Sequence, residues 1–506
     1  MENSVTNWLD HIADAMPGKL AIYDENRSIS YGEYRKKSLA IAREILLFRN
    51  RKKSDGKIPV AIYLKKGLEV PVSFLGVAYA GGFYSPIDIS MPKERVIKIL
   101  GVLLPKLVIT TEELKKNFQE LGYQGEFLIY ENILSKEGDA EIVREISDRI
   151  IDTDLLYVLF TSGSTGIPKG VAIRHKSVVD YIDWVTETFN ISREDSFGNQ
   201  APFYFDNSVL DIYSCIKTGA TMYIIPPKLF SQPLPLLSYI KDHGINSIFW
   251  VPSALMIVSS FKTFRKVELQ GVLKRVLFCG EVMPNKHLNI WREYLPDVVY
   301  ANLYGPTEIT DACTYYIVDR EFDDGESLPI GFPMKNTDIL LLDENDSPTI
   351  EGEVGELCVR GTCLAAGYYN DKKRTDEVFV QNPLNNSIPE KIYKTGDLVK
   401  FNERGELIFL SRKDFQIKHL GHRIELGEIE TAAATLDGTS FCCCLYDEKH
   451  SMIVLFIDCN LSMRYVREKL GKMLPEYMLP GKLVYLEKMP MNINGKIDRA
   501  RLKDFL

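Results

Sequence analysis

The sequence lacks what a membrane-spanning, secreted or nucleic-acid-binding protein needs. No window approaches the about 18 consecutive apolar residues of a membrane-spanning helix. A signal peptide needs a basic start and an unbroken apolar stretch, whereas this chain begins with acidic side chains and interrupted apolar runs. The net charge of −8, from 61 basic and 69 acidic residues, argues against non-specific nucleic-acid binding. We therefore expect a cytoplasmic protein with no membrane insertion and no nucleic-acid partner.

Cysteines with the spacing of metal ligands are also missing. The nine cysteines contain no Cys-x-x-Cys pair, and three of them, Cys442, Cys443 and Cys444, are adjacent. Adjacent side chains on a strand point to opposite faces, so these three predict a buried strand rather than a metal site. Unpaired cysteines in this number indicate a reducing compartment.

The length and the apolar patterns predict a multidomain α/β protein. At 506 residues the chain exceeds the roughly 250–300 residues at which a single core stops growing. Residues 150–410 alternate short apolar runs such as "LLYVLF" with amphipathic helical patterns such as "KSVVDYIDWVTETFN". This alternation predicts mostly parallel sheets with helices on both faces.

The last part of the chain has a different pattern. After about residue 340, "DILLLD", "GELCVRG" and "LVKFNERGELIFL" predict antiparallel strands in a small barrel-like part. The charged stretch 411–426, "SRKDFQIKHLGHRIEL", is typical of a loop and suggests a boundary. Helical and strand patterns beyond it suffice for a small α/β domain. We predict a large domain over residues 1–412, a small mobile domain over residues 413–506, and a hinge at Asp414.

A glycine- and hydroxyl-rich loop, "TSGSTGIPKG" at residues 161–170, follows one predicted strand. Glycines let backbone N–H groups turn toward an anion, while hydroxyls and a lysine add donors and positive charge. The spacing does not fit a Walker A loop. Such a loop is as often a linker as a phosphate site, but the strand pattern "VAIRH" directly after it favours a phosphate-binding loop.

Further segments follow in order: "FDNSVLDIY" (205–213), "NLYGPTE" (302–308), "GELCVRGTCLAAGYYND" (355–371), "YKTGD" (393–397) and "NGKIDR" (494–499). With the loop, they make the chain resemble the adenylate-forming superfamily nearly end to end. The resemblance is greatest to amino-acid adenylation domains of nonribosomal peptide synthetases and to D-alanine–carrier protein ligases. It implies two half-reactions, in which a carboxylate attacks the α-phosphorus of MgATP and a carrier-protein phosphopantetheine thiol then displaces AMP.

The resemblance also implies a role for each matched residue, with ATP and Mg²⁺ as cofactors. Glu308 would bind Mg²⁺, Thr307 would face the α-phosphate, and Lys496 would bridge the substrate carboxylate and the α-phosphate. Asp397, which we expect after a tight turn, would take the ribose hydroxyls with help from Arg412. The β- and γ-phosphates would lie against Thr161, Ser162, Gly163, Ser164, Thr165 and Lys169, and adenine against Tyr304, Asn302 and the Gly280–Glu281 backbone. Between half-reactions the small domain would rotate near Asp414, withdrawing Lys496 and bringing residues 418–421 toward the thiol.

Asp206 matches the aspartate that pairs with the α-ammonium of an amino acid, and its alternative reading is a helix N-cap. A buried carboxylate needs a cationic partner, so Asp206 favours an amino acid over a fatty or aromatic acid. The other matched pocket positions are Asn207, Leu210, Phe249, Leu277, Cys279, Leu303, Asp311 and Ala312.

These pocket positions leave the substrate open. Large side chains suggest a restricted pocket, and Cys279 and Ala312 resemble D-alanine ligases. Asn207 and Asp311 depart from that pattern. Asp311 either receives a side-chain amine or hydroxyl, or points to a lysine or water outside the pocket.

We weigh several functions. The first is a free-standing, monomeric enzyme that loads a small amino acid onto a separate carrier protein. One variant transfers D-alanine toward teichoic acid, and the other starts a natural-product pathway such as nonribosomal peptide synthesis with another small or polar amino acid. A carboxylic acid:CoA ligase is disfavoured by Asp206. A catalytically silent nucleotide-binding protein is disfavoured because Lys169, Glu308, Asp397, Arg412 and Lys496 are all present.

Overall fold

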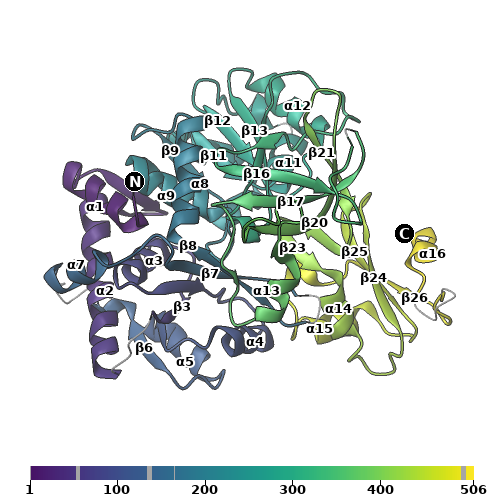
Figure 1. Ribbon diagram of the computed structural model, residues 1–506, viewed down its shortest axis with the longest axis horizontal. Coiled ribbons are helices and arrows are strands. Elements are labelled where there is room, and N and C mark those ends of the chain that lie inside the picture. The colour runs from purple at the N-terminus through teal and green to yellow at the C-terminus, as the bar shows by residue number, and fades with distance from the viewer. Residues whose placement is uncertain are drawn as a thin grey trace. The chain divides into compact units, whose positions relative to one another are not determined.

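The computed structural model describes residues 2–52, 57–133, 140–163, 166–261, 263–350, 352–491 and 497–506. The chain, whose helices and strands are labelled in Figure 1, divides into two units. Unit 1 comprises Met1–Asp88, Pro105–Leu159 and Val171–Lys413, and unit 2 comprises Ile89–Leu104, Phe160–Gly170 and Asp414–Leu506. The domain assignment and the hinge role of Asp414 stay predictions.

A mostly parallel sheet forms the first layer of unit 1. In the described part of the chain its strands follow the order β15 (Phe332–Pro333), β14 (Thr314–Ile317), β13 (Val299–Tyr304), β12 (Arg275–Phe278), β11 (Ser247–Trp250), β9 (Ser196–Asn199), β10 (Thr221–Ile224), β1 (Leu20–Asp24), β2 (Arg27–Ser30). Adjacent strands from β13 to β1 run parallel. At the edges, β14 is antiparallel to β13, β15 is antiparallel to β14, and β2 is antiparallel to β1.

A second mostly parallel sheet and an antiparallel sheet complete the strands described for this unit. The second sheet has the order β18 (Gly367–Tyr368), β8 (Lys169–Arg174), β7 (Leu155–Thr161), β4 (Phe83–Pro86), β3 (Pro59–Tyr63), β5 (Leu107–Thr110), β6 (Glu126–Ile129). The antiparallel sheet has the order β16 (Thr337–Leu342), β17 (Gly355–Gly361), β20 (Lys391–Phe401), β19 (Phe379–Gln381), and β21 (Leu407–Arg412) also pairs with β20. The predicted α/β class with parallel sheets and a barrel-like antiparallel part is confirmed.

Helices separate and cover these strands. The helices of unit 1 are α1 (Val5–Ala15), α2 (Tyr31–Lys52), α3 (Glu69–Tyr79), α5 (Glu112–Gln119), α6 (Tyr130–Ile133), α7 (Ala140–Ser147), α8 (His175–Thr188), α9 (Ser208–Thr218), α10 (Pro233–Asp242), α11 (Pro252–Ser260), α12 (Asn285–Tyr294) and α13 (Lys372–Val378). No helix among the described residues is long and apolar enough to cross a membrane.

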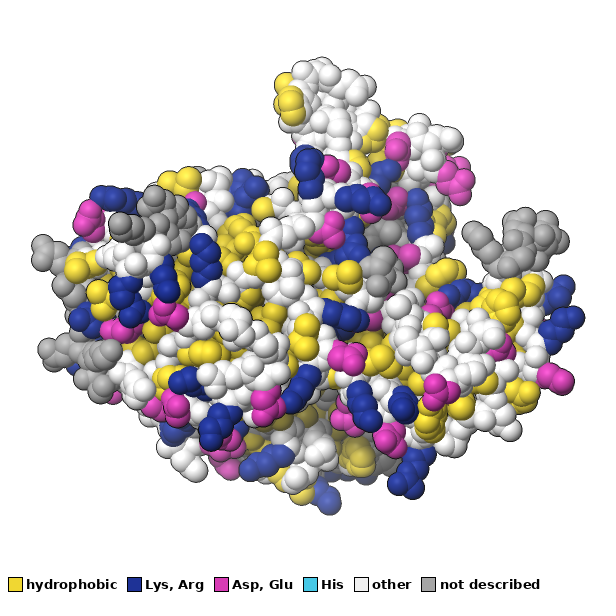
Figure 2. All heavy atoms as spheres, turned by 90° about the horizontal axis from the view of Figure 1, so that it is seen from below, with side chains coloured by type: hydrophobic (Ala, Val, Ile, Leu, Met, Phe, Trp, Pro, Cys, Tyr) yellow, Lys and Arg dark blue, Asp and Glu magenta, His cyan; other side chains and the backbone are white. Residues whose placement is uncertain are grey.

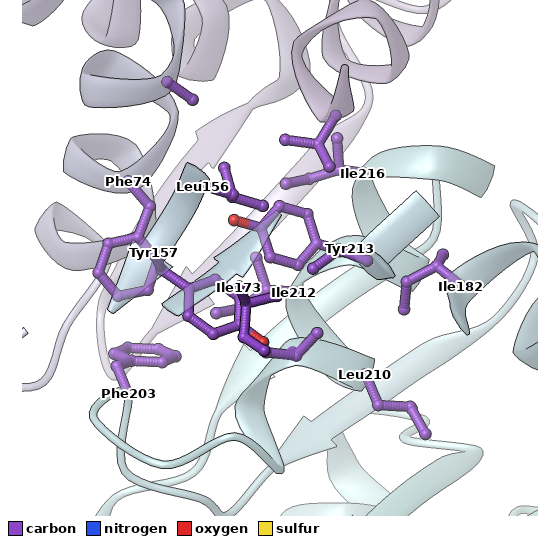
Figure 3. Packing of buried hydrophobic residues seen from close by; sticks show 14 of the residues in the cluster. Phe74, Leu156, Tyr157, Ile173, Ile182, Phe203, Leu210, Ile212, Tyr213 and Ile216 are labelled. Carbon is purple, nitrogen blue, oxygen red and sulfur yellow. The ribbon is translucent and has the colours of Figure 1, made fainter. Parts of the chain in front are cut away.

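The core of unit 1 forms where β7, α3, α8 and α9 meet (Figure 3). Phe74 of α3 stacks on Tyr84 of β4 with ring centroids 3.9 Å apart, and the Tyr84 and Tyr213 hydroxyls are 2.7 Å apart. Burying each such side chain stabilises the fold by roughly 1.5–3 kcal/mol. The helices and strands that carry the predicted pocket residues therefore pack against this core.

Unit 2 is a small α/β unit. Its elements are α4 (Lys93–Leu103), the hairpin of β22 (Gln416–His419) and β23 (His422–Glu425), α14 (Leu426–Ala433), β24 (Cys442–Asp447), β25 (Met452–Ile457), α15 (Met463–Leu470), β26 (Lys482–Tyr485) and α16 (Arg499–Leu502). The cysteine-rich run is a strand as predicted, with Cys443 and Cys444 in different apolar clusters and therefore on opposite faces. All nine cysteines are free thiols.

The prediction of a loop over residues 411–426 is wrong, because β22 and β23 form a hairpin there. Charged side chains dominate these residues, and the apolar pair in which Ile417 lies opposite Ile424 is formed only when the two strands meet. Leu420 and Gly421 take positive φ at the turn. On the face drawn in Figure 2, basic and acidic side chains are interspersed, in keeping with the small net charge.

Candidate active site

Asp397 lies at a bulge inside strand β20, not after a tight turn as predicted. The register of β20 against β17 shifts opposite Leu357, where Gly396 takes a φ of 75°. Glycine adopts this conformation without strain, which lets the strand continue through an extra residue. The Thr395 hydroxyl fixes the bulge by accepting from the Asp397 N–H at 3.0 Å and donating to the Leu357 carbonyl at 2.7 Å.

Two donors hold the Asp397 carboxylate. Arg412 Nη1 donates to Oδ1 and the Tyr304 hydroxyl donates to Oδ2. Arg412 is itself fixed, since its Nη2 donates to the Thr395 carbonyl at 3.0 Å. Burial and the adjacent Asp397 charge raise the pKa of Tyr304 well above its usual value, which keeps the phenol protonated as a donor. The structure thus brings together three of the predicted nucleotide residues around one buried carboxylate.

Glu308 lies in a short helical turn, Thr307–Ile309, after β13 and is fully buried. Its Oε1 accepts from the Tyr368 hydroxyl at 2.6 Å. The turn requires glycine at position 305, because a Cβ there would lie 2.7 Å from the Asp311 carbonyl oxygen. One oriented protein carboxylate is the donor set that Mg²⁺ uses together with nucleotide phosphates. The described residues contain no group of three or more metal-ligating side chains, so the rest of the coordination shell would come from nucleotide and water.

The residues predicted near the adenine are used mainly in local structure. Asn302 Nδ2 donates to the Pro329 carbonyl at 2.8 Å, and Glu281 Oε2 accepts from the Ser253 N–H at 2.9 Å. Gly280, two residues after the end of β12, takes a φ of 96°, a conformation that favours glycine. These contacts hold the strand ends in place. The adenine contacts of these residues stay predictions.

Asp206 lies two residues before the start of α9. The helix begins at Ser208 with Asn207 in the N-cap position, so Asp206 is not its N-cap residue. The Asp206 carboxylate accepts from the Asn207 N–H at 3.1 Å, and Asp206 is 9% exposed. The remaining predicted pocket residues are all buried: Asn207, Leu210, Phe249, Leu277, Cys279, Leu303, Asp311 and Ala312.

The backbone conformation places Asp311 inside unit 1. Thr310 and Asp311 take positive φ, which is rare for residues with a Cβ and common at functional sites. The Tyr181 hydroxyl of α8 donates to Asp311 Oδ2 at 2.6 Å. Besides burial, the charges of Asp206 and Asp311 both raise the pKa values of Tyr157 and Tyr181. The two carboxylates therefore share the same buried tyrosines.

In unit 2, the glycine-rich loop contacts strand β23. The Ser162 hydroxyl donates to the Arg423 carbonyl at 2.8 Å and accepts from the Glu425 N–H at 3.1 Å. Lys169 Nζ lies 3.1 Å from Glu425 Oε1. Gly166 takes a φ of 74° and its N–H donates to the Gly163 carbonyl at 2.8 Å. The loop lysine thus has a carboxylate partner in this structure.

Some predicted residues lie outside the described residues, namely Ser164, Thr165 and Lys496. Other residues were missed by the motif analysis, namely Tyr368, Tyr181 and Glu425, which hold predicted residues in place. Tyr368 lies within the segment 355–371 that carries the resemblance, so the sequence could have indicated it. Tyr181 and Glu425 have no comparable sequence signal.

Comparison with known proteins shows the family. The AMP-binding enzyme family matches residues 9–369. Zwittermicin A synthase ZmaJ of Bacillus cereus is 33% identical over 96% of this chain and 92% of its own length. A D-alanine–D-alanyl carrier protein ligase of Bacillus licheniformis is 31% identical over 97% of both chains. Tyrocidine synthase 1 of Brevibacillus parabrevis is 32% identical over 99% of this chain but only 45% of its own length.

A solved structure supports the same fold. The Vibrio cholerae adenylation domain AlmE, crystallised with glycyl-adenosine-5′-phosphate, has a TM-score of 0.84 at 21% identity, over 100% of this chain and 98% of that chain. The chain belongs to the AMP-binding enzymes. Within them it is an adenylating ligase related to amino-acid adenylation domains and D-alanine–carrier protein ligases.

Proposed function

We propose that the protein activates a small amino acid as its aminoacyl-AMP and then transfers it to the phosphopantetheine thiol of a separate carrier protein. In the first step an amino-acid carboxylate oxygen bonds to the α-phosphorus of ATP, and pyrophosphate leaves with the electrons of the broken P–O bond. In the second step the thiol gives up its proton, its sulfur bonds to the acyl carbon, and AMP leaves with the electrons of the broken C–O bond. Both steps need positioning and charge neutralisation rather than a protein nucleophile.

The observation that carries the proposal is the buried carboxylate of Asp206. In a buried site the attraction between a carboxylate and a cationic ligand is strong, because little water screens the two charges. An α-ammonium supplies such a cation, whereas a fatty or aryl acid does not. Because Asn207 holds the N-cap position, the capping interpretation of Asp206 loses support.

The nucleotide roles rest on the contacts of unit 1. The Asp397 carboxylate, oriented by Arg412 and Tyr304, suits a pair of ribose hydroxyls because its oxygens accept hydrogen bonds. Glu308, oriented by Tyr368, would hold Mg²⁺. When bound, Mg²⁺ neutralises phosphate charge and orients the leaving pyrophosphate.

The substrate is either D-alanine or an amino acid with a polar side chain. Cys279 and Ala312 favour D-alanine, and one curated relative is a D-alanine–D-alanyl carrier protein ligase. Asn207 and Asp311 favour a polar side chain, because both are buried polar groups. The burial of Asp311 supports a polar amino acid over D-alanine, although the Tyr181 hydroxyl already donates to its carboxylate.

Amino-acid-dependent ATP–pyrophosphate exchange tests the proposal. The panel should hold L- and D-amino acids with apolar, hydroxyl and amine side chains, together with aryl and fatty acids. We expect exchange with a small amino acid and none with the aryl and fatty acids. Exchange with D-alanine alone would favour D-alanine transfer toward teichoic acid. Exchange only with aryl or fatty acids would overturn the proposal.

A further inference from the structure

The segment Gln200–Asn207 joins strand β9 to helix α9 and carries Asp206. We propose that Lys66, Asn199 and Asp211 are positioning residues that hold this segment and thereby aim Asp206 at the amino-acid ammonium. The inference rests on the proposed function, because it assumes that Asp206 binds the ammonium. It assigns a task to the buried pair Asn199 and Asp211, which the adenylation chemistry does not otherwise use.

Lys66 holds the segment at two points. Its Nζ donates to the Gln200 carbonyl at 2.9 Å and lies 5.6 Å from the centroid of the Phe203 ring. A cation at this distance from an aromatic face is attracted to it. Phe203 is 4% exposed and packs edge-on against Phe74, with ring centroids 6.3 Å apart, so the ring cannot move freely. Lys66 therefore anchors both the start and the middle of the segment to the loop before α3.

Asn199 and Asp211 hold the two elements that the segment connects. Asn199 is the last residue of β9, and Asp211 lies in the first turn of α9. Asn199 Nδ2 donates to Asp211 Oδ2 at 2.9 Å, and both residues are fully buried. Fixing these elements against each other limits where a connecting segment of this length can place Asp206.

The same contact borders the proposed pocket. Asn199 is paired in parallel register with Phe249, and Phe249 with Leu277. Residues in register on adjacent strands present their side chains on the same face of a sheet. The Asn199–Asp211 contact thus lies beside two of the side chains that we propose as pocket walls.

The charges in this cluster change near neutral pH. Burial lowers the pKa of Lys66 to about 7, against the attraction of Asp211 on α9 and of Asp24 on β1. Burial also raises the pKa of Asp211 to about 8, against the Asn199 hydrogen bond and the Lys66 charge. Asp24 is additionally paired with Arg27. Deprotonation of Lys66 removes its attraction to the Phe203 ring and weakens its bond to Gln200.

A charge-removing variant with a matched control tests the inference. In ATP–pyrophosphate exchange by the full chain, Lys66→Met should raise the amino-acid KM about tenfold while the ATP KM changes less than about twofold. Lys66→Arg should restore the amino-acid KM because it keeps a cation at the same place. The neighbouring Lys65, which is exposed and pairs with Glu113, serves as control, and Lys65→Met should behave as wild type.

A pH profile distinguishes positioning from general structural support. For wild type, kcat/KM for the amino acid should fall as the pH rises above about 7, and Lys66→Arg should flatten that fall. An unchanged profile in Lys66→Arg, or equal changes in both KM values in Lys66→Met, would overturn the inference. The arginine profile decides the matter if Lys66→Met does not fold. Absence of any amino-acid-dependent exchange in wild type would instead overturn the proposed function.

Discussion

At the scale of single residues, hydrogen-bond donors determine what the proposed catalytic carboxylates can do. Asp397 is oriented by Arg412 and Tyr304, and Glu308 by Tyr368. Each carboxylate oxygen can accept more than one hydrogen bond, so a carboxylate held by donors presents its remaining lone pairs in fixed directions, which suits a hydroxyl or a metal ion. The tyrosines are therefore as informative about function as the acids that they contact.

Replacing Asp206 tests the ammonium contact. Asp206→Asn removes the charge but keeps the size of the side chain, so the amino-acid KM should rise at least about 30-fold and the ATP KM should stay nearly unchanged. The exposed aspartate of α8, Asp183, provides a control, and Asp183→Asn should leave both constants unaltered. Comparable changes in the two KM values after Asp206→Asn would refute the assignment.

Removing the Tyr368 hydroxyl tests the role of Glu308. Tyr368→Phe leaves the carboxylate without this donor, so the Mg²⁺ concentration for half-maximal exchange should rise about tenfold. Tyr369→Phe is the matched control, since Tyr369 is the adjacent, partly exposed tyrosine. A Mg²⁺ titration of both variants gives the answer, and identical midpoints would count against Glu308 as the metal ligand.

Motifs predicted most of the residues that come together here but not their partners. Asp397 and Arg412 were predicted from the resemblance and do meet. The Tyr181–Asp311 contact joins residues 130 positions apart, and the Lys169–Glu425 contact joins residues 256 positions apart. No local pattern encodes such pairs, because they exist only once the chain has folded. The bulge at Asp397 was not predicted either, because it depends on the positive φ that Gly396 takes in the folded sheet.

At the scale of elements, apolar periodicity predicted the strands and helices well. Runs such as "LLYVLF" became β7, and the helical pattern after residue 175 became α8. The hairpin of β22 and β23 was missed because charged side chains dominate its composition. Periodicity succeeds where apolar and polar side chains alternate over several residues, and it fails in a short hairpin that buries only a few apolar side chains among charged ones.

The contact between α1 and α8 makes stability depend on pH. His175 at the start of α8 is buried, and its Nδ1 accepts from the Val5 N–H at 3.4 Å, near the Ser4 hydroxyl. Burial and the charge of Lys57 lower the pKa of His175 to about 3. The unfolded chain binds this proton near pH 6.5, so stability should fall as the pH drops below about 6.5, by about 2 kcal/mol at pH 5.

Chemical unfolding at a series of pH values measures this effect. His175→Asn should lower stability at pH 7 but remove much of the loss between about pH 7 and pH 5. His11→Asn is the control, because the His11 side chain is 68% exposed. An unchanged pH dependence in His175→Asn would show that other groups cause the acid destabilisation.

At the scale of the whole molecule, the chain matches relatives of about its own length and one part of longer synthases alike. It spans 92% of zwittermicin A synthase ZmaJ and 45% of tyrocidine synthase 1. The superfamily was predictable from sequence while the substrate was not, because the two depend on very different numbers of residues. Substrate choice depends on a few pocket side chains, whereas the fold depends on hundreds of residues.

Separate assays of the two half-reactions test the proposed role of Lys496, which lies outside the described residues. Lys496→Ala should slow aminoacyl-AMP formation by about 10²–10³-fold, because it removes a cation from the α-phosphate. Thioester formation from supplied aminoacyl-AMP should remain largely intact. Lys503→Ala, at an exposed lysine near the same end of the chain, should affect neither step. Equal losses in both half-reactions would contradict alternation between two active arrangements.

The most direct test of the central claim is an isotope-transfer experiment. The protein is incubated with ATP and the preferred amino acid, labelled with ¹⁸O in its carboxylate, and the released AMP is examined by mass spectrometry. If the carboxylate attacks the α-phosphorus, AMP should carry one ¹⁸O atom and pyrophosphate none. Unlabelled AMP, or ¹⁸O in orthophosphate together with ADP, would contradict adenylation as the function of this protein.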